Sequence, residues 1–294
     1  MSELFLVDAS VYVFRAYFGM SHEMTDSEGN PSNAVYGFTG FLCSLLEQAN
    51  PSHIAIAFDE SLETSFRNDI DPQYKANRDP APLELKRQFA HCRAVAEAMG
   101  MECFSDDRYE ADDLIGTLTR LPEMAEHHHM IVTSDKDLAQ LLRPQDQLWD
   151  FARNLRTSYE GVKEKFGVMP EQIADYLALT GDSVDNIKGV PGIGPKAASA
   201  LLSHFGTLDE ALERASEVEF LSVRGAKSLS AKLKTYAEDA RLARRLTGIH
   251  CEAPIPSPTP SLTLGSVDMG AVNDLFDYLN FGGTLRQRVG NLAA

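Results

Sequence analysis

The stretches LFLVD (residues 4–8), HIAIAFD (53–59) and MIVTSD (130–135) decide the fold, because each is a short apolar run that closes on an aspartate. Between the first two, apolar residues recur at the spacing of an amphipathic helix over 35–49, and the same spacing returns over 85–99. Strands that alternate with amphipathic helices are typical of βαβ units. The sequence therefore predicts an α/β core whose central sheet is mostly parallel and flanked by helices.

The remainder of the chain has a different pattern. After about residue 157 the strand signal disappears, and short helices separated by Gly/Pro turns replace it. The segment PIPSPTPS (255–262) has the composition of a linker, and a short helix is expected within 266–290. We therefore expect an α/β core over 1–157, an all-helical part over 158–250, and a Pro-rich linker with a C-terminal helix over 251–294.

Composition excludes several classes of protein. With 44% hydrophobic and 24% charged residues in a chain of 294, neither a disordered nor a fibrous protein is expected. No run of about 18 apolar residues is present, and the N-terminus, MSELFLVDAS, has no basic leader. The four cysteines share no metal-ligand spacing. We therefore expect a cytoplasmic protein with reduced thiols and no membrane partner.

Charge is distributed unevenly along the chain. The net charge of −16 (pI about 4.9) argues by itself against a nucleic-acid ligand. However, residues 186–250 carry ten basic and seven acidic side chains, a net charge of +3, which leaves −19 on the rest of the chain. The helical part is therefore the relatively basic part of an acidic protein.

Acidic residues occupy positions that the predicted sheet would bring together. Three of them end predicted parallel strands, at the sheet edge where ligands bind in open α/β folds. Others open the predicted helix in YEADDLIGTLTR (109–120), or lie three apart in TGDSVDN (180–186), on one face of a helical turn. Each acid alone could be a helix cap or a surface charge. The candidate metal ligands are Asp8, Asp59, Glu110, Asp112, Asp113, Asp135, Asp137, Asp182 and Asp185.

Electrostatic repulsion indicates what such a cluster requires. Two carboxylates about 4 Å apart repel by roughly 4 kcal/mol at an effective dielectric of 20, so cations must hold the cluster together. Only one lysine, Lys136, lies between Glu110 and Asp137. Oxygen ligands without His or Cys select hard cations. We therefore expect Mg²⁺, with Mn²⁺ as a substitute, and at least two ions per site, as in two-metal phosphodiester hydrolysis.

A glycine-containing segment is typical of DNA backbone binding. In NIKGVPGIGPKAASALL (186–202), Gly192 and Gly194 allow backbone N–H groups to approach a phosphate, and Pro195 starts a helix whose dipole favours an anion. Lys196 adds a mobile cation on the same surface. The pattern predicts a helix–hairpin–helix element over 187–204 that holds DNA without reading its sequence. A plain turn is the alternative.

Residues 66–78 combine aromatic and basic side chains. The spacing of Tyr74 and Arg78 places both on one helical face, with Lys75 beside them. This pattern favours a mobile element above the cleft, with cations for a scissile phosphate and an aromatic ring on which a base stacks. A solvated loop is the alternative.

The chain resembles the 5′ nuclease (flap endonuclease-like) family through motifs in that family's order and spacing: LFLVDASVYVFRAYF, IAIAFDE, SFRNDIDPQYKANR, YEADDLIG, TSDKDLAQL, ALTGDSVDNIKGVPGIGPKAASALL and SVRGAKSLSAKL. The resemblance covers about 3–250 and is greatest to the N-terminal 5′–3′ exonuclease domain of bacterial DNA polymerase I, which we expect here as a stand-alone protein. It implies a PIN-like nuclease core with an arch at about 62–85 and a helix–three-turn–helix DNA-binding subdomain. The implied activity is two-metal hydrolysis of DNA with 5′-phosphate products, in replication or repair.

The resemblance also implies roles for individual residues. The nine acids would be the metal ligands, Lys75, Arg78 and Arg15 would orient or stabilise the scissile phosphate, and Tyr74 would be the arch aromatic. The implied DNA substrates are 5′ flaps, nicks, and gapped or 5′-ended duplexes, and the helix–three-turn–helix element can carry K⁺. Predicted DNA contacts are Arg67, Lys188, Gly192, Gly194, Lys196, Lys227 and Lys232.

Two other functions remain open. One is a DNA-structure-binding protein with reduced nuclease activity, although a pure binder gains nothing from nine repelling carboxylates. The other is a metal-dependent RNase with a related core, which the duplex-holding element does not favour. Under the nuclease hypothesis, Asp113→Ala or Asp182→Ala is expected to abolish cleavage and leave a folded protein.

Overall fold

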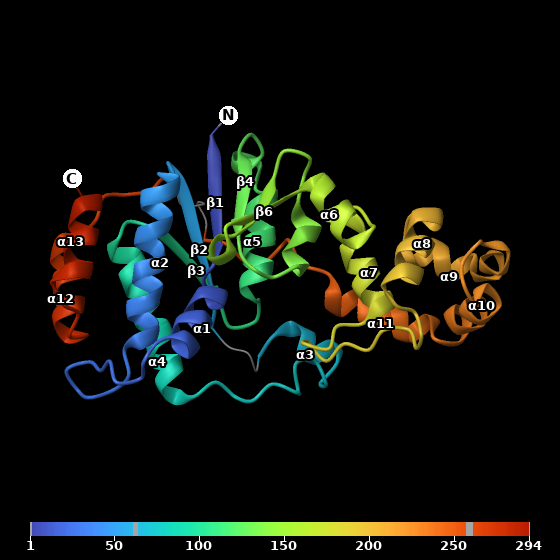
Figure 1. The fold of residues 1–294 in the computed structure, drawn as a ribbon, viewed down its shortest axis with the longest axis horizontal. Coiled ribbons are helices and arrows are strands. Elements are labelled where there is room, and N and C mark those ends of the chain that lie inside the picture. Colours follow the sequence, from blue (N-terminus) through green and yellow to red (C-terminus); the bar gives the residue numbers. More distant parts are fainter. Residues whose placement is uncertain (1, 61–63, 257–260, 294) are drawn as a thin grey trace.

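A six-stranded sheet forms the centre of the molecule, with helices on both faces and a group of helices beyond one side (Figure 1). The computed structural model describes residues 2–60, 64–256 and 261–293. Part of the predicted arch (residues 61–63) and part of the predicted linker (257–260) lie outside the described residues. The strands are β1 (Glu3–Asp8), β2 (His53–Asp59), β3 (Glu102–Asp106), β4 (His128–Val132), β5 (Gln147–Asp150) and β6 (Leu155–Ser158).

The strand order is β3-β2-β1-β4-β5-β6, with β1 to β5 parallel and β6 antiparallel to β5. This confirms the predicted mostly parallel α/β sheet, although β5 and β6 were not predicted as separate strands. The chain order reverses between β1 and β4, and ligands bind outside the carboxyl ends of strands at such a switch point. Asp8 is the last residue of β1, so its carboxylate lies at this crevice.

Alternation along β1 explains the two cores. Leu4 and Leu6 face one side of the sheet, while Phe5 and Val7 face the other, and all four are almost fully buried. The second face is covered by α1 (Ala9–Gly19), α2 (Asn33–Ala49), α4 (Leu83–Ala98), α12 (Met269–Tyr278) and α13 (Gly283–Leu292).

The C-terminal segment differs from the prediction. It forms two helices rather than one, because Asn280 adopts a positive φ (55°) after α12 and the chain turns before α13 begins. These helices pack on α4 and α2, at the edge of the molecule opposite the helical part (Figure 1).

The first face of the sheet continues into the helical part through one hydrophobic core, which includes Leu4 of β1 and Leu233 of α10. Since that core crosses residue 157, the expected boundaries at 157 and 250 stay predictions. Near the site, α11 (Ala237–Thr247) contacts both α7 (Ile173–Thr180) and the short α3 (Phe66–Ile70).

The remaining helices are α5 (Ala111–Arg120), α6 (Tyr159–Phe166), α8 (Pro195–Phe205), α9 (Leu208–Glu213) and α10 (Ala226–Thr235). Short 3₁₀ helices are η1 (Pro122–Met124), η2 (Asp137–Leu141), η3 (Phe151–Arg153), η4 (Pro170–Gln172) and η5 (Ala215–Phe220).

The structure also bears on the membrane and cysteine expectations. In the described parts of the chain, no helix combines the length and the hydropathy that crossing a membrane requires. All four cysteines are free thiols, two of them buried (Cys43 and Cys92) and two partly buried (Cys103 and Cys251).

Candidate active site

Four aspartates meet at the carboxyl edge of the sheet with little to neutralise them. Burial, and then the charges of Asp59 and Asp135, raises the pKa of Asp8 to about 7. Burial, and then the charges of Asp135, Asp8 and Asp59, likewise raises the pKa of Asp112 well above its usual range. The part of each shift that neighbouring charges cause reflects carboxylates that lie close to one another. The structure therefore brings four of the predicted ligands into one repelling group.

A hydroxyl group and a helix N-terminus position this group. The hydroxyl of Thr133 donates to Asp8 Oδ2 (2.9 Å) and accepts a hydrogen bond from the backbone N–H of Asp135 (2.9 Å). The backbone N–H of Ala111, the first residue of α5, donates to Asp59 Oδ1 (2.8 Å). Thr133 is not among the residues predicted from the sequence, although its place two residues before Asp135, at the end of an apolar run, is a usable signal.

The arch contributes cations to two further acids. Lys75 Nζ lies 2.7 Å from Glu110 Oε2 and 3.9 Å from Asp185 Oδ2, and Arg78 lies 2.5 Å from Asp185 Oδ1. The hydroxyl of Tyr74 donates to Glu110 Oε2 (3.1 Å) and to Asp185 Oδ2 (3.2 Å). Burial lowers the pKa of Lys75, but the charges of Glu110 and Asp185 outweigh it and the net pKa is raised. In this conformation the arch closes onto the acidic site.

The arch differs from the prediction in two respects. Residues 72–77 form consecutive turns rather than a helix, with Lys75 at a positive φ of 54°. Tyr74 and Arg78 nevertheless reach the same carboxylate, that of Asp185. Tyr74 is only 4% exposed, so its ring is packed inside rather than presented to solvent as a stacking surface.

The 180–186 segment was also predicted as a helical turn, and the structure corrects this. Gly181 (φ 79°) ends α7, and the backbones of Asp182 and Ile187 then exchange hydrogen bonds (2.9 and 2.7 Å). Within this turn the backbone N–H of Val184 donates to Asp182 Oδ1 (2.8 Å). The other carboxylate oxygen of Asp182, Oδ2, accepts a hydrogen bond from the ammonium of Lys136.

Lys136 neutralises the acids on this side. Its Nζ lies 2.5 Å from Asp182 Oδ2 and 3.2 Å from Asp137 Oδ1. Burial favours the protonated form of Asp182, but the Lys136 contact outweighs it and lowers the pKa. Burial, and then the charge of Asp135, raises the pKa of Asp137 to about 7. Neutralisation is therefore good at Asp182 and incomplete at Asp137.

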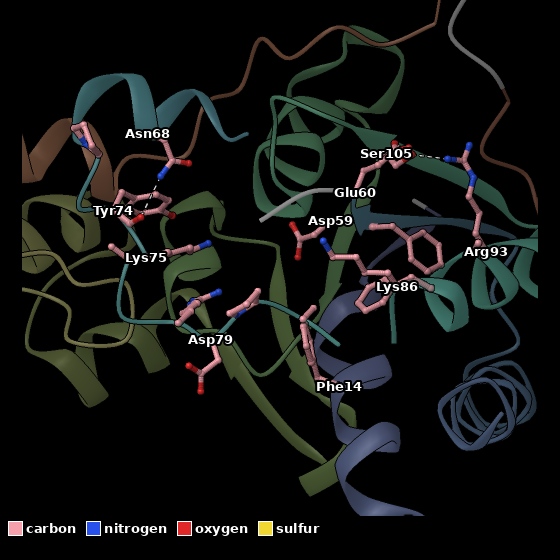
Figure 2. A pocket seen from close by; sticks show the side chains of 18 residues that line it. Phe14, Asp59, Glu60, Asn68, Tyr74, Lys75, Asp79, Lys86, Arg93 and Ser105 are labelled. Atoms are coloured by element: carbon pink, nitrogen blue, oxygen red, sulfur yellow. Dashed lines mark hydrogen bonds between the residues drawn. The ribbon is translucent and has the colours of Figure 1, made fainter. Parts of the chain in front are cut away.

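Two cavities open beside these acids. One, of about 360 Å³, is lined by Asp135, Asp137, Asp182, Asp185, Lys136 and Lys165, among others. Lys165 is not among the residues predicted from the sequence. The other, of about 600 Å³, lies between the arch and helices α1 and α4, and Figure 2 shows Phe14, Asp59, Lys75 and Lys86 around it. Asp59 connects this cavity to the acidic edge.

The structure corrects the expected roles of Asp113 and Arg67. Asp113 is fully buried, and both of its oxygens accept hydrogen bonds from the Arg67 guanidinium (2.7 Å each). Asp113 also accepts from the backbone N–H groups of Glu110 (3.1 Å) and His250 (2.8 Å). Arg67 is 3% exposed and donates to the carbonyls of Leu246 and Gly248. The oxygens of Asp113 are therefore occupied by these donors, and Arg67 is unavailable to DNA.

The chemistry of the remaining oxygens fits a hard divalent ion. Glu110 Oε1 and Asp137 Oδ1 are buried without a hydrogen-bond partner. Too few basic side chains lie near the four aspartates to neutralise them, and the atoms that they offer to a cation are all carboxylate oxygens. As the side chains stand in the described part of the chain, no three His, Cys, Asp or Glu residues form a ready-made metal-binding group. Lys75, Arg78 and Lys136 hold several of the oxygens that such a group would use.

The predicted DNA-holding element begins α8. Gly194 is the N-cap residue, Pro195 is the first residue of the helix, and Gly192 has a positive φ of 78°. Lys232 from α10 packs its Nζ against Gly192, so these two predicted contacts share one surface. Lys188, Lys196, Lys227 and, on α1, Arg15 are exposed. Their DNA contacts and the K⁺ site stay predictions.

Comparison with known proteins identifies the family. The 5′–3′ exonuclease N-terminal resolvase-like domain matches residues 3–167, and the 5′–3′ exonuclease C-terminal SAM fold matches residues 168–270. The chain belongs to the 5′–3′ exonuclease family. It is 33% identical to a 5′–3′ exonuclease of Buchnera aphidicola subsp. Schizaphis graminum over 279 residues, which covers 95% of this chain and 96% of that one.

Longer relatives contain the same region. The chain is 40% identical to DNA polymerase I of Pseudomonas aeruginosa (95% of this chain, 30% of that one) and 39% identical to that of Rhizobium leguminosarum (89% and 26%). It thus spans about a quarter to a third of those proteins. Among solved structures, zinc-bound T5 5′-exonuclease matches with a TM-score of 0.68 at 20% identity, covering 99% of this chain and 100% of that one. The catalytic core of Rad2 in complex with DNA substrate matches with a TM-score of 0.65 at 14% identity (99% and 91%). At these identities the two structures support the fold.

Proposed function

We propose that this member of the 5′–3′ exonuclease family is a divalent-metal-dependent, structure-selective 5′ nuclease that hydrolyses DNA at 5′ ends and flaps. The observation that carries the proposal is the group of four repelling aspartates (Asp8, Asp59, Asp112 and Asp135) at the switch point of the sheet. A protein that only binds DNA gains no affinity from such a group, because buried like charges cost stability. Family membership supports the same conclusion.

Eight of the nine predicted acids would hold the ions, Mg²⁺ or Mn²⁺, with Asp113 left out because it is paired with Arg67. When bound, such ions supply positive charge to the phosphate oxygens and lower the pKa of water at the site. The chain's own contribution is to hold the carboxylates close together against their repulsion. Thr133 does so by linking Asp8 to the backbone of Asp135.

The arch would supply cations to the substrate. Lys75 and Arg78 are bound to Glu110 and Asp185 in this conformation. Both side chains lie at the edge of the cleft, where they would offset charge on the scissile phosphate. The cavity of about 600 Å³ beneath the arch would accept the single strand, and its wall includes Phe14 and Phe89, whose rings meet edge to face (5.6 Å).

Duplex DNA would be held by the element at the start of α8. Its backbone N–H groups and helix dipole favour a phosphate, and Lys196 and Lys232 add charge nearby. Because contacts of this kind release counterions, binding should weaken steeply with salt. A K⁺ ion at this element and a cytoplasmic location stay predictions.

Cleavage of labelled 5′-flap, nicked and gapped DNA, with and without Mg²⁺, tests the proposal. We expect metal-dependent 5′-phosphate products, and we expect Asp135→Asn to remove cleavage while DNA binding persists. Lys163→Gln, an exposed change on α6, serves as a control. Flap binding without cleavage in either metal would identify a DNA-structure-binding protein, and faster cleavage of the matching RNA would identify an RNase.

A further inference from the structure

Lys136 lies between two segments that are far apart in the sequence. Its side chain comes from the loop after β4 and contacts Asp137, the first residue of η2. The same ammonium reaches across to Asp182 in the turn after α7, at 2.5 Å. It also lines the cavity of about 360 Å³ with Asp135 and Asp185. One ammonium group therefore occupies the position where several carboxylates face the same space.

The ion pair leaves part of this site uncompensated. The ammonium donates a hydrogen bond to Asp182 Oδ2 at 2.5 Å, whereas its distance to Asp137 Oδ1 is longer, at 3.2 Å. No hydrogen-bond partner is assigned to the buried Asp137 Oδ1. A lysine ammonium has only three donors in tetrahedral directions, so it cannot satisfy several converging oxygens as a small dication can.

We propose that Lys136 is a resident counter-ion that competes with a divalent cation for Asp137 and Asp182, and thereby sets the affinity of the ion site on that side of the cleft. The inference rests on the proposed metal-dependent function and adds a residue that determines its metal affinity. The side chain of Lys136 is 40% exposed, so its flexible stem can carry the ammonium into water when it is displaced. Lys75, at 11% exposed, has no such freedom without movement of the arch.

The competition has a defined direction. A cation that must first open an ion pair binds more weakly than one that meets free carboxylates, because the population of the competent state is reduced. Removing the ammonium should therefore strengthen metal binding, while it exposes the metal-free protein to unrelieved repulsion between Asp137 and Asp182. A residue that merely supported the fold would weaken metal binding when removed.

Isothermal titration calorimetry of the full chain tests this without DNA. MgCl₂, and separately MnCl₂, is titrated into protein treated with chelator, for the wild type, Lys136→Gln, Lys136→Arg and Lys163→Gln. We expect Lys136→Gln to bind one ion about three- to tenfold more tightly, the effect of losing a half-exposed, charge-assisted contact. Lys136→Arg keeps the competing charge and should bind like the wild type. Lys163→Gln changes the net charge equally from an exposed position outside the cavity and should also bind like the wild type.

Thermal unfolding adds a second readout. Lys136→Gln should unfold at a lower temperature than the wild type without metal, and the difference should shrink or reverse at saturating Mg²⁺. Unchanged or weaker metal binding by Lys136→Gln overturns the inference, as does an equal gain in Lys163→Gln. Failure of the wild type itself to bind either ion would instead refute the proposed metal-dependent function.

Discussion

Replacing Asp113 with alanine should destabilise the protein strongly. Its two carboxylate oxygens hold the guanidinium of Arg67, and the backbone N–H groups of Glu110 and His250 also donate to them. These contacts join the base of the arch, the start of α5 and the chain that follows α11. Burial lowers the pKa of Arg67, but the hydrogen bond and charge of Asp113, together with the charge of Glu110, outweigh it and the net pKa is raised, so the charge of Arg67 persists inside the protein.

The magnitude follows from what the mutation leaves behind. Arg67 is 3% exposed, and removal of one partner of a buried ion pair costs about 3–5 kcal/mol, because the other charge is left uncompensated. The total free energy of unfolding of a domain is about 5–15 kcal/mol. Asp113→Ala should therefore remove a large part of the protein's free energy of unfolding. This result would contradict the expectation from the sequence that the variant stays folded and loses only cleavage.

Urea unfolding can be followed through Trp149, which is the only tryptophan and is fully buried. Asp182→Ala is the matched comparison, because the Lys136 ammonium that loses this partner is 40% exposed, can be hydrated and keeps its contact with Asp137. We expect its loss of stability to be below about 1 kcal/mol. The double variant Arg67→Met/Asp113→Leu should recover most of the loss, since it removes both charges. A cost below about 1 kcal/mol for Asp113→Ala, or no recovery in the double variant, would refute the assignment.

Three further predictions concern single residues. In metal-free protein, Asp8→Asn should gain stability relative to the wild type as pH rises from about 4 to about 7, by at most about 1.4 kcal/mol per pH unit. The reason is that the raised pKa of Asp8 lets the native wild type keep a proton that its unfolded chain has lost, so the wild type loses stability over this range. Urea unfolding at three pH values checks this, and a constant difference between the two proteins would contradict it. Lys75→Met should lower kcat about 10²–10³-fold with a smaller change in KM in steady-state flap cleavage, and Lys75→Arg should restore part of the loss. Gly192→Ala should weaken the binding of flap duplex about tenfold, because φ is 78° at this residue and the new methyl group would meet Lys232. Fluorescence anisotropy measures the affinity, and an unchanged affinity would show that the turn tolerates a side chain.

The acidic edge of the sheet was predictable because its signal is local. Apolar runs that end in aspartate identify β1 and β2 together with their last residues. The parallel arrangement then brings Asp8 and Asp59 to the same edge, whatever the intervening chain does. β5 and β6 were missed because each has four residues, too few for a period of two to stand out.

The turns near the site were less predictable because tertiary contacts determine them. The 72–77 and 182–187 segments both show spacings compatible with a helical turn, yet both are irregular. In the second, Gly181 ends α7 and the backbone of Asp182 pairs with Ile187. In the first, the backbone N–H of Lys75 donates to the carbonyl of Asp185, which ties the two turns together. Each turn therefore depends on the other, and no local pattern contains that information.

Asp112 and Asp113 are adjacent in the sequence and have opposite environments, and helix geometry explains why. Successive residues of an α-helix are rotated by about 100°, so two neighbouring carboxylates at the start of α5 cannot both face the cleft. Asp113 is fully buried, and a carboxylate in such a place persists only with a cationic partner. That partner is Arg67, 46 residues earlier in the chain. The EADD motif therefore indicates that acids begin a helix. Which of these acids is a candidate metal ligand and which is half of a buried ion pair becomes clear only when the position of Arg67 in the fold is known.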